Sequence, residues 1–178
     1  MTVGNQGTFR QMIETKRLLL REFSYSDSTF VIELLNDSAW IKNIGDKHVR
    51  TVADANTYLK NGPIASYRNN GFGLYAVELK KEGVIVGTCG LINRPSLEDV
   101  DVGFALLPQF REKGYALEAS IAVLDTARSV HNLQRVLAIV LPENTASIRL
   151  VEKLGMVFDK EVLLPDDPTP LACYSVEL

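Results

Sequence analysis

The sequence predicts a mixed α/β domain in which about four helices flank one central sheet of about seven strands. Short apolar runs bounded by turn formers, with period two at 100–106, predict strands, and apolar spacing of three and four residues at 114–129 predicts a helix. The chain has 178 residues, 46% hydrophobic and 23% charged, which is typical of one globular domain. No repeat or linker divides it. We therefore predict a flexible segment at 1–13 and a single domain at 14–178.

The N-terminal part is predicted to begin with a strand and to continue with helices. The apolar run 17–23 ends near turn formers, so it predicts a strand, and a short helix follows it. Residues 36–50 are polar and predict a loop or a broken helix. Residues 52–67 have roughly helical spacing that a Gly-Pro pair interrupts.

The middle of the chain is predicted to be β. Residues 72–79 and 84–92 predict two strands joined by the hairpin turn 80–83. The run 84–92 is apolar at every position except a few small residues, which is typical of a central buried strand. The strand at 100–106 ends before Pro108, because proline cannot donate to a ladder.

The C-terminal part alternates between the two periods. A helix is predicted at 114–129, a strand at 135–141 and a second helix at 144–154. Two final strands are predicted at 156–163 and 171–176, separated by a proline-rich turn.

Charge and composition exclude several classes of function. Lys plus Arg is 19 and Asp plus Glu is 22, so the net charge is 19 − 22 = −3, which argues against nucleic-acid binding. The N-terminal residues lack a signal-peptide pattern, and no apolar run approaches the roughly 18 residues of a membrane helix. We therefore expect a cytoplasmic protein without a membrane partner. Two Cys and two His without metal-ligand spacing predict that there is no metal site.

The segment 106–116 has the composition of an anion site. A strand ends, a loop carries Arg111 and Lys113, and a helix begins around Gly114 and Ala116. The first N–H groups of a helix are unpaired and attract anions, and small residues let a phosphate approach closely. On spacing alone, a solvated turn between a strand and a helix explains the segment equally well.

Arg111, Gly114 and Ala116 resemble the Arg/Gln-x-x-Gly-x-Gly/Ala signature of the Gcn5-related N-acetyltransferase (GNAT) superfamily. Further elements follow the family's order, with Met156 in place of its usual Phe: Asp101-Val102-Gly103-Phe104, Asn144-x-x-Ser147 and Leu154-Gly155-Met156. Near the start, Thr15-x-Arg17-Leu18-x-Leu20-Arg21 resembles the ribosomal-protein N-terminal acetyltransferase branch. The resemblance covers the chain from about residue 14 onward and implies the GNAT fold, in which the sheet is mostly antiparallel.

The resemblance also implies an activity. An acetyl group would move from acetyl-CoA to a primary amine by direct attack in a ternary complex, with no metal. The acceptor would be a small molecule or a protein N-terminus, and the enzyme a monomer or homodimer. The cofactor-binding residues that the resemblance implies are Phe104, Leu106, Arg111, Glu112, Lys113, Gly114, Tyr115, Ala116 and Asn144. Lys153, on the helix that follows Asn144, could reach the phosphates of the cofactor or belong to a solvated face.

Two catalytic residues follow from the same resemblance. Asp101 occupies the family's acidic position and would deprotonate the amine through a water molecule, or act electrostatically. Alternatively, Asp99 and Asp101 form a solvated strand face. Ser147 matches the serine that would protonate the departing thiolate; a structural hydroxyl, with water as the acid, is the alternative. Asn144 would bind the pantetheine arm, cap a helix, or do both.

Two other functions stay open from the sequence. The domain could be a non-catalytic acyl-CoA-binding regulatory module, or a phosphate-binding domain of unrelated fold. If it is an enzyme, its acceptor could be a protein N-terminus, a polyamine, an amino acid or an aminoglycoside.

Overall fold

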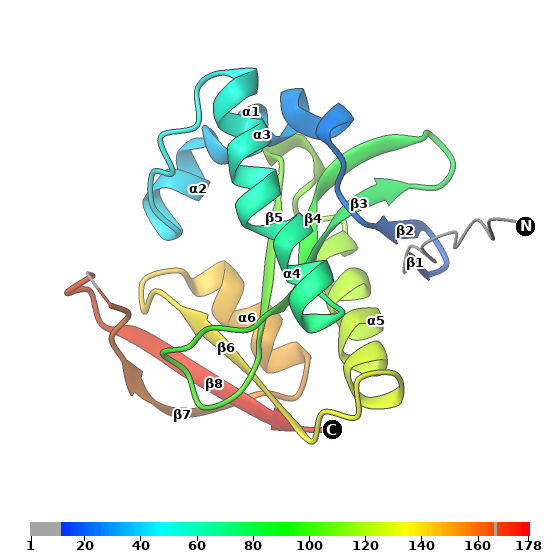
Figure 1. Cartoon of the computed structure of the whole chain (residues 1–178). Coiled ribbons are helices and arrows are strands. Elements are labelled where there is room, and N and C mark those ends of the chain that lie inside the picture. The colour runs from blue at the N-terminus through cyan, green and yellow to red at the C-terminus, as the bar shows by residue number, and fades with distance from the viewer. Residues whose placement is uncertain (1–11, 166) are drawn as a thin grey trace, which may run out of the picture.

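The protein, described by a computed structural model over residues 12–165 and 167–178, is built around one eight-stranded sheet (Figure 1). Its strand order is β1-β2-β3-β4-β5-β6-β8-β7. The strands are β1 (Met12–Glu14), β2 (Leu18–Arg21), β3 (Leu74–Leu79), β4 (Val84–Ile92), β5 (Asp101–Leu106), β6 (Arg135–Val140), β7 (Val157–Val162) and β8 (Leu171–Glu177). Neighbouring strands are antiparallel except β5 and β6, which are parallel. The predicted mixed, mostly antiparallel sheet is therefore confirmed.

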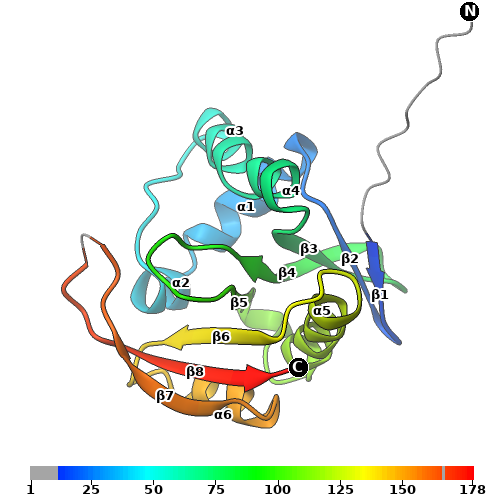
Figure 2. The same cartoon turned by 60° about the horizontal axis from the view of Figure 1, so that its bottom comes forward.

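Helices cover both faces of this sheet (Figure 2). They are η1 (Tyr25–Asp27), α1 (Ser28–Leu35), α2 (Ser38–Asn43), α3 (Val52–Asn61), α4 (Pro63–Asn70), η2 (Pro108–Phe110), α5 (Tyr115–Ser129) and α6 (Thr145–Lys153). The larger buried cluster lies between the sheet and α5 and α6, and the smaller one packs α1, α2 and α3 onto the opposite face. Each face of β5 thus belongs to a different core.

Local chemistry sets the ends of the helices on the α1–α4 face. Asp37 caps α2, because its Oδ2 accepts hydrogen bonds from the backbone N–H groups of Ala39 and Trp40 at 3.1 and 3.2 Å. Between α3 and α4, a Cβ on Gly62 would lie 2.9 Å from the Tyr58 carbonyl oxygen, so glycine is required there. Pro63 follows as the first residue of α4, where its missing N–H is tolerated.

The parallel strands β5 and β6 separate soon after they begin. Their register contains one pair, Asp101 with Leu137, beside the hydrogen bond from Leu137 N–H to the Val100 carbonyl at 2.9 Å. Beyond that pair the two strands diverge, as Figure 1 shows. The C-terminal part of β5 therefore has a ladder partner on the β4 side alone.

Most of the predicted elements are confirmed, with differences of one to two residues at their ends. The described ranges hold eight strands rather than seven, because the three-residue edge strand β1 was not predicted. They hold six α-helices rather than four, because the region 36–50 contains α2 and the Gly-Pro break divides 52–67 into two helices. The predicted flexible segment 1–13 lies outside the described residues except for its last two, which belong to β1. None of the helices described is long and apolar enough to cross a membrane.

Candidate active site

Backbone N–H groups of β5 point into the region where β6 has left the sheet. The N–H of Leu107 donates to the Val86 carbonyl at 2.9 Å, and the β4–β5 register makes these two residues direct partners. Hydrogen-bonded pairs alternate along an antiparallel ladder, so the backbone N–H and C=O groups of even-numbered residues of β5 point away from β4. Val102 lies beside the single β5–β6 pair. The N–H groups of Phe104 and Leu106 are left facing the splay, by which we mean the opening between β5 and β6 beyond the Asp101–Leu137 pair.

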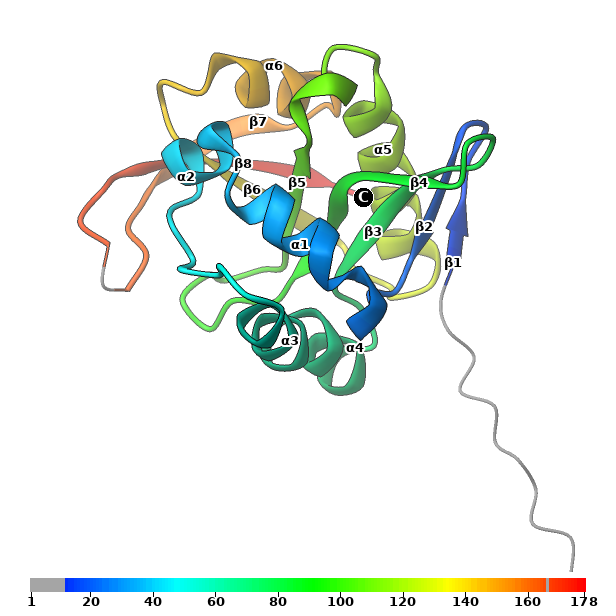
Figure 3. The same ribbon diagram turned by 90° about the horizontal axis from the view of Figure 1, so that it is seen from above.

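The loop after β5 presents a second set of free N–H groups. η2 and the start of α5 follow the C-terminal end of β5 (Figure 3). Glu112 and Gly114 have φ angles of 61° and 78°, left-handed conformations of the kind that occur in anion-binding nests. The amides of 112–117 make no hydrogen bond to any described residue. These amides, of which 115–117 belong to the first turn of α5, form a site suited to phosphate.

The Arg111 side chain joins this loop to the helical layer on the other side. Its Nε donates to the Leu106 carbonyl at 3.0 Å, and its Nη2 forms an ion pair with Asp37, the cap of α2. Arg111 is thereby held in the protein, so it fixes the loop rather than offering a free charge. Lys113, whose Nζ lies 5.6 Å from the Phe110 ring centroid, is the exposed cation of the loop.

A clip from the β1–β2 turn holds the start of α5. Arg17 Nη1 donates to the Lys113 carbonyl at 3.0 Å, and its guanidinium lies 4.5 Å from the Tyr115 ring centroid. Its Nε pairs with Glu118 Oε2 at 2.6 Å, while Thr15 Oγ1 donates to Glu118 Oε1 at 2.7 Å. Arg17 therefore neutralises the acid in the first turn of α5, which would otherwise oppose an anion there.

Asp101 lies at the vertex of the splay, the point from which β5 and β6 separate, and is buried, with 1% of its surface exposed. It belongs to the β5 face that carries Ala105, which packs in the α1–α4 core. Arg94 Nε donates to its Oδ1 at 2.8 Å. Burial raises the pKa of Asp101 above its ordinary value although Arg94 opposes the rise. The alternative of a solvated strand face is wrong for Asp101, since the helical layer covers it.

The start of α6 brings two more predicted residues to the end of β6. Asn144 is the cap of α6, and its Oδ1 accepts a hydrogen bond from the Ser147 N–H at 3.2 Å, so the capping role is present. The Ser147 hydroxyl makes no hydrogen bond to another residue of the described chain, unlike a serine that bonds back to the preceding turn. The Ser147 hydroxyl and the Asn144 NH₂ group therefore keep unused hydrogen-bonding capacity.

Lys153 is not brought to the loop. It lies in the last turn of α6 and lines a surface pocket with Leu124, Asp125 and Arg128 from the second half of α5. Arg128 is 13 residues beyond Tyr115, about 20 Å along a helix. The other predicted cofactor residues lie on β5, on the 111–116 loop or at the start of α6.

Three charged side chains support the site in contacts that were not predicted from the sequence. Asp37 lies 74 residues from Arg111, and no local pattern links them. Arg94 had a usable signal, because it follows one strand of a hairpin while its partner Asp101 opens the next. Arg17 was noted as part of the opening motif, but its contact with the loop depends on tertiary packing.

Comparison with known proteins agrees with this geometry. Residues 17–157 match the family described as "Acetyltransferase (GNAT) domain". The chain belongs to the GNAT acetyltransferase family. It is 32% identical over 144 residues to an uncharacterized N-acetyltransferase, YnaD, of Bacillus subtilis, covering 81% of each chain.

Solved structures share the fold of this acetyltransferase. A GNAT-family acetyltransferase from Bacillus anthracis superposes with a TM-score of 0.79 at 27% identity, covering 94% of this chain and 98% of that one. RimL, a ribosomal L7/L12 alpha-N-protein acetyltransferase in complex with coenzyme A, gives a TM-score of 0.80 at 15% identity, covering 94% and 98%. At that identity the likeness to RimL concerns the fold, so the ribosomal-protein branch stays a prediction. Within 12–165 and 167–178, no group of three or more His, Cys, Asp or Glu side chains is placed to hold a metal ion.

Proposed function

We propose that this acetyltransferase transfers the acetyl group of acetyl-CoA to a primary amine by direct attack in a ternary complex. The observation that carries the proposal is the set of unpaired amides at 112–117, beside a strand whose N–H groups face an open splay. A diphosphate accepts several such N–H bonds at once, and no side-chain charge is needed for most of them. The coenzyme A bound to RimL, of the same fold, supports this assignment.

The rest of the cofactor follows from the direction of the strands. With its diphosphate on the 112–117 loop, the pantetheine arm would enter the splay and accept hydrogen bonds from the N–H groups of Phe104 and Leu106. The amide of Asn144, whose Oδ1 caps α6, retains its NH₂ group for the same arm. The thioester would then lie toward the vertex, where Asp101 begins the strand. The N–H of Phe104, the unpaired donor nearest the vertex, would polarise the thioester carbonyl as negative charge develops on its oxygen.

Asp101 would receive the proton of the attacking amine through a water molecule. One oxygen, Oδ1, accepts from Arg94, which leaves Oδ2 for the water. An ordinary aspartate is a weak base, and the burial that raises its pKa makes it a better proton acceptor near neutral pH.

Ser147 supplies the proton that the leaving sulfur needs. The amine nitrogen forms a bond to the carbonyl carbon, the carbon–sulfur bond breaks, and the sulfur leaves with the electron pair. The Ser147 hydroxyl, which has no other partner among the described residues, donates a proton to that thiolate and regains one from solvent.

A thiol-release assay with acetyl-CoA and a panel of amines and N-terminal peptides tests the proposal. We expect release of coenzyme A with at least one amine and a product heavier by one acetyl group. Asp101→Asn should lower kcat by about a hundredfold or more with little change in the Kd of coenzyme A. Asp99→Asn is the matched control, because Asp99 pairs with Arg135 outside the splay. Tight coenzyme A binding without release for any amine would favour the non-catalytic binding module instead.

A further inference from the structure

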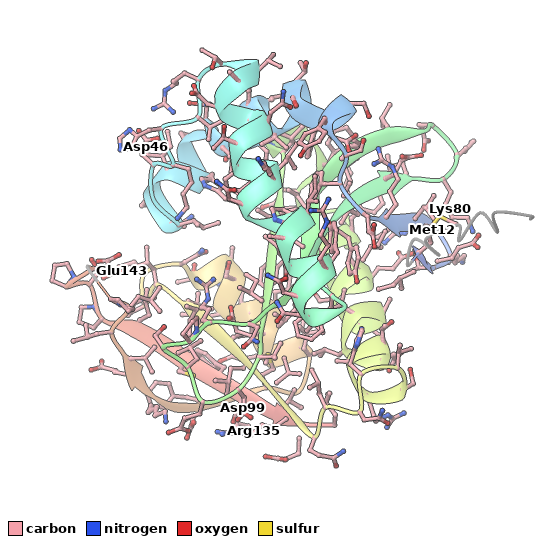
Figure 4. The ribbon with its side chains drawn as sticks, in the orientation of Figure 1. Met12, Asp46, Lys80, Asp99, Arg135 and Glu143 are labelled. Carbon is pink, nitrogen blue, oxygen red and sulfur yellow. The ribbon has the colours of Figure 1, made fainter. Side chains whose placement is uncertain are left out.

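The segment 93–100, which joins β4 to β5, carries a charge pattern that the proposed chemistry does not use. Two of its acids form ion pairs with basic residues of β6 and β7. Glu98 pairs with Lys160 at 3.1 Å, and Asp99 pairs with Arg135 at 3.1 Å. Figure 4 shows Asp99 and Arg135 next to each other at the lower edge of the molecule. Arg94 is therefore the charged residue of this segment that keeps unused hydrogen-bond donors.

Arg94 is anchored at one position and open at the others. Its Nε bonds to Asp101, whose side chain is 2% exposed, while the Arg94 side chain is 32% exposed. Its terminal nitrogens, Nη1 and Nη2, form no hydrogen bond to a residue within the described ranges. One end of the guanidinium is thus fixed by the buried acid, and the other end keeps its N–H donors unused.

The neighbours of Arg94 belong to the helical layer on one side of the sheet. The neighbouring Asn93 donates to the Asn70 side chain at 3.2 Å, which ties the segment to the end of α4. From α3, the Tyr58 hydroxyl lies near enough for the Arg94 charge to oppose the burial that raises the pKa of Tyr58 to about 12. Arg94 therefore lies where the helical layer, the 93–100 segment and the vertex of the splay meet.

We propose that Arg94 selects the acceptor, by binding through its free guanidinium edge a carboxylate that the acceptor carries close to its amine. Two parallel N–H donors match a carboxylate in a bidentate geometry. A polyamine has no carboxylate for this edge to bind, and one of its cationic groups would have to lie next to the Arg94 guanidinium. The acceptor class is thus an amino acid or a compound with the same arrangement of amine and carboxylate, rather than a polyamine.

This inference rests on the proposed acetyl transfer, and its test separates the two. The assay measures kcat/KM with acetyl-CoA for L-alanine, for L-alaninamide and for spermidine. The first two acceptors differ in the carboxylate and in amine basicity, so the measured quantity is the change in their ratio between variant and wild type. Arg94→Gln deprives Asp101 of its ion pair and so changes kcat for both acceptors, an effect that the ratio removes.

We expect wild type to prefer L-alanine to spermidine, and Arg94→Gln to reduce the alanine-to-alaninamide ratio by about tenfold or more. Arg94→Lys should keep part of the preference, because it keeps the charge without the bidentate edge. Arg68→Gln, which removes an exposed arginine from α4, should leave the ratio unchanged. Spermidine as the preferred acceptor, or an unchanged ratio in Arg94→Gln, would overturn the carboxylate assignment alone. No thiol release with any amine would overturn the proposed function and this inference with it.

Discussion

Replacing Gly114 by alanine tests whether the shape of the 112–117 loop is what binds the cofactor. Gly114 has φ +78°, a conformation that costs a residue with a Cβ about 1–2 kcal/mol. The added Cβ would lie 3.3 Å from Arg17 Nη2, the flexible end of a side chain, so strain rather than collision dominates. For a domain of this size the cost lowers the Tm by about 2–8 °C.

The same strain should turn the amides on either side of residue 114 away from the diphosphate. Loss of one hydrogen bond to a charged group is worth about 1.5–3 kcal/mol, and 1.4 kcal/mol is tenfold in a dissociation constant. We therefore expect the Kd of coenzyme A, measured by calorimetry, to rise about ten- to a hundredfold in Gly114→Ala.

Gly155→Ala is the matched control for this prediction. Gly155 follows α6 with φ +81°, and a Cβ there meets no other heavy atom within 4 Å. It should lose a similar amount of thermal stability in the absence of ligand while binding coenzyme A as wild type does. Equal affinities for the two variants would refute the reasoning, because a generally weakened fold would then explain everything that Gly114→Ala does.

Four further predictions concern charged and hydroxyl groups. Burial raises the pKa of Asp101, so its charge lowers the free energy of unfolding at neutral pH, and Asp101→Asn should not lower the Tm at pH 7. The same variant should lack the acidic limb of the pH profile of kcat. A Tm loss as large as that of Asp27→Asn would contradict this prediction. At Asp27, burial also pushes the pKa upward but the bonds from Arg21 and from Ser24 outweigh it, so its stabilising contribution is present at pH 7 and disappears as the pH falls through its lowered pKa. Ser147→Ala should lower kcat about a hundredfold with the Kd of coenzyme A unchanged, whereas an unaltered kcat would assign the proton to water. Asp37→Asn keeps an oxygen for the α2 cap but removes the negative charge that pairs with Arg111. Steady-state kinetics should then give a KM for acetyl-CoA about fivefold higher. An unchanged KM would show that this ion pair does not hold the 112–117 loop.

The order of strands and helices could be predicted because their apolar periods are strong and local. The central strand β4, the α3–α4 break at a Gly-Pro pair and the switch from strand to helix at 106–115 depend on neighbouring residues. The three-residue strand β1 carries too little pattern to be recognised, since its pairing with β2 depends on the sheet.

The site was predictable where it rests on the backbone and less so where it rests on contacts between distant segments. Glycine at 114 and a helix start after a strand indicate free amides, as found. The separation of β5 from β6 depends on how two strands far apart in sequence twist, so no local pattern reports it. The burial of Asp101 likewise depends on a helical layer contributed by residues more than thirty positions away, and period-two alternation could not tell that layer from solvent.

The central claim is that the open amides of 112–117 hold the diphosphate of the cofactor. Amide chemical shifts of the isotope-labelled protein report on it directly when coenzyme A and pantetheine, which lacks the diphosphate, are titrated in separate samples. The account predicts large shifts of the 112–117 amides with coenzyme A and small ones with pantetheine, while the amides of Phe104 and Leu106 respond to both ligands. Unshifted 112–117 amides at saturating coenzyme A would contradict it.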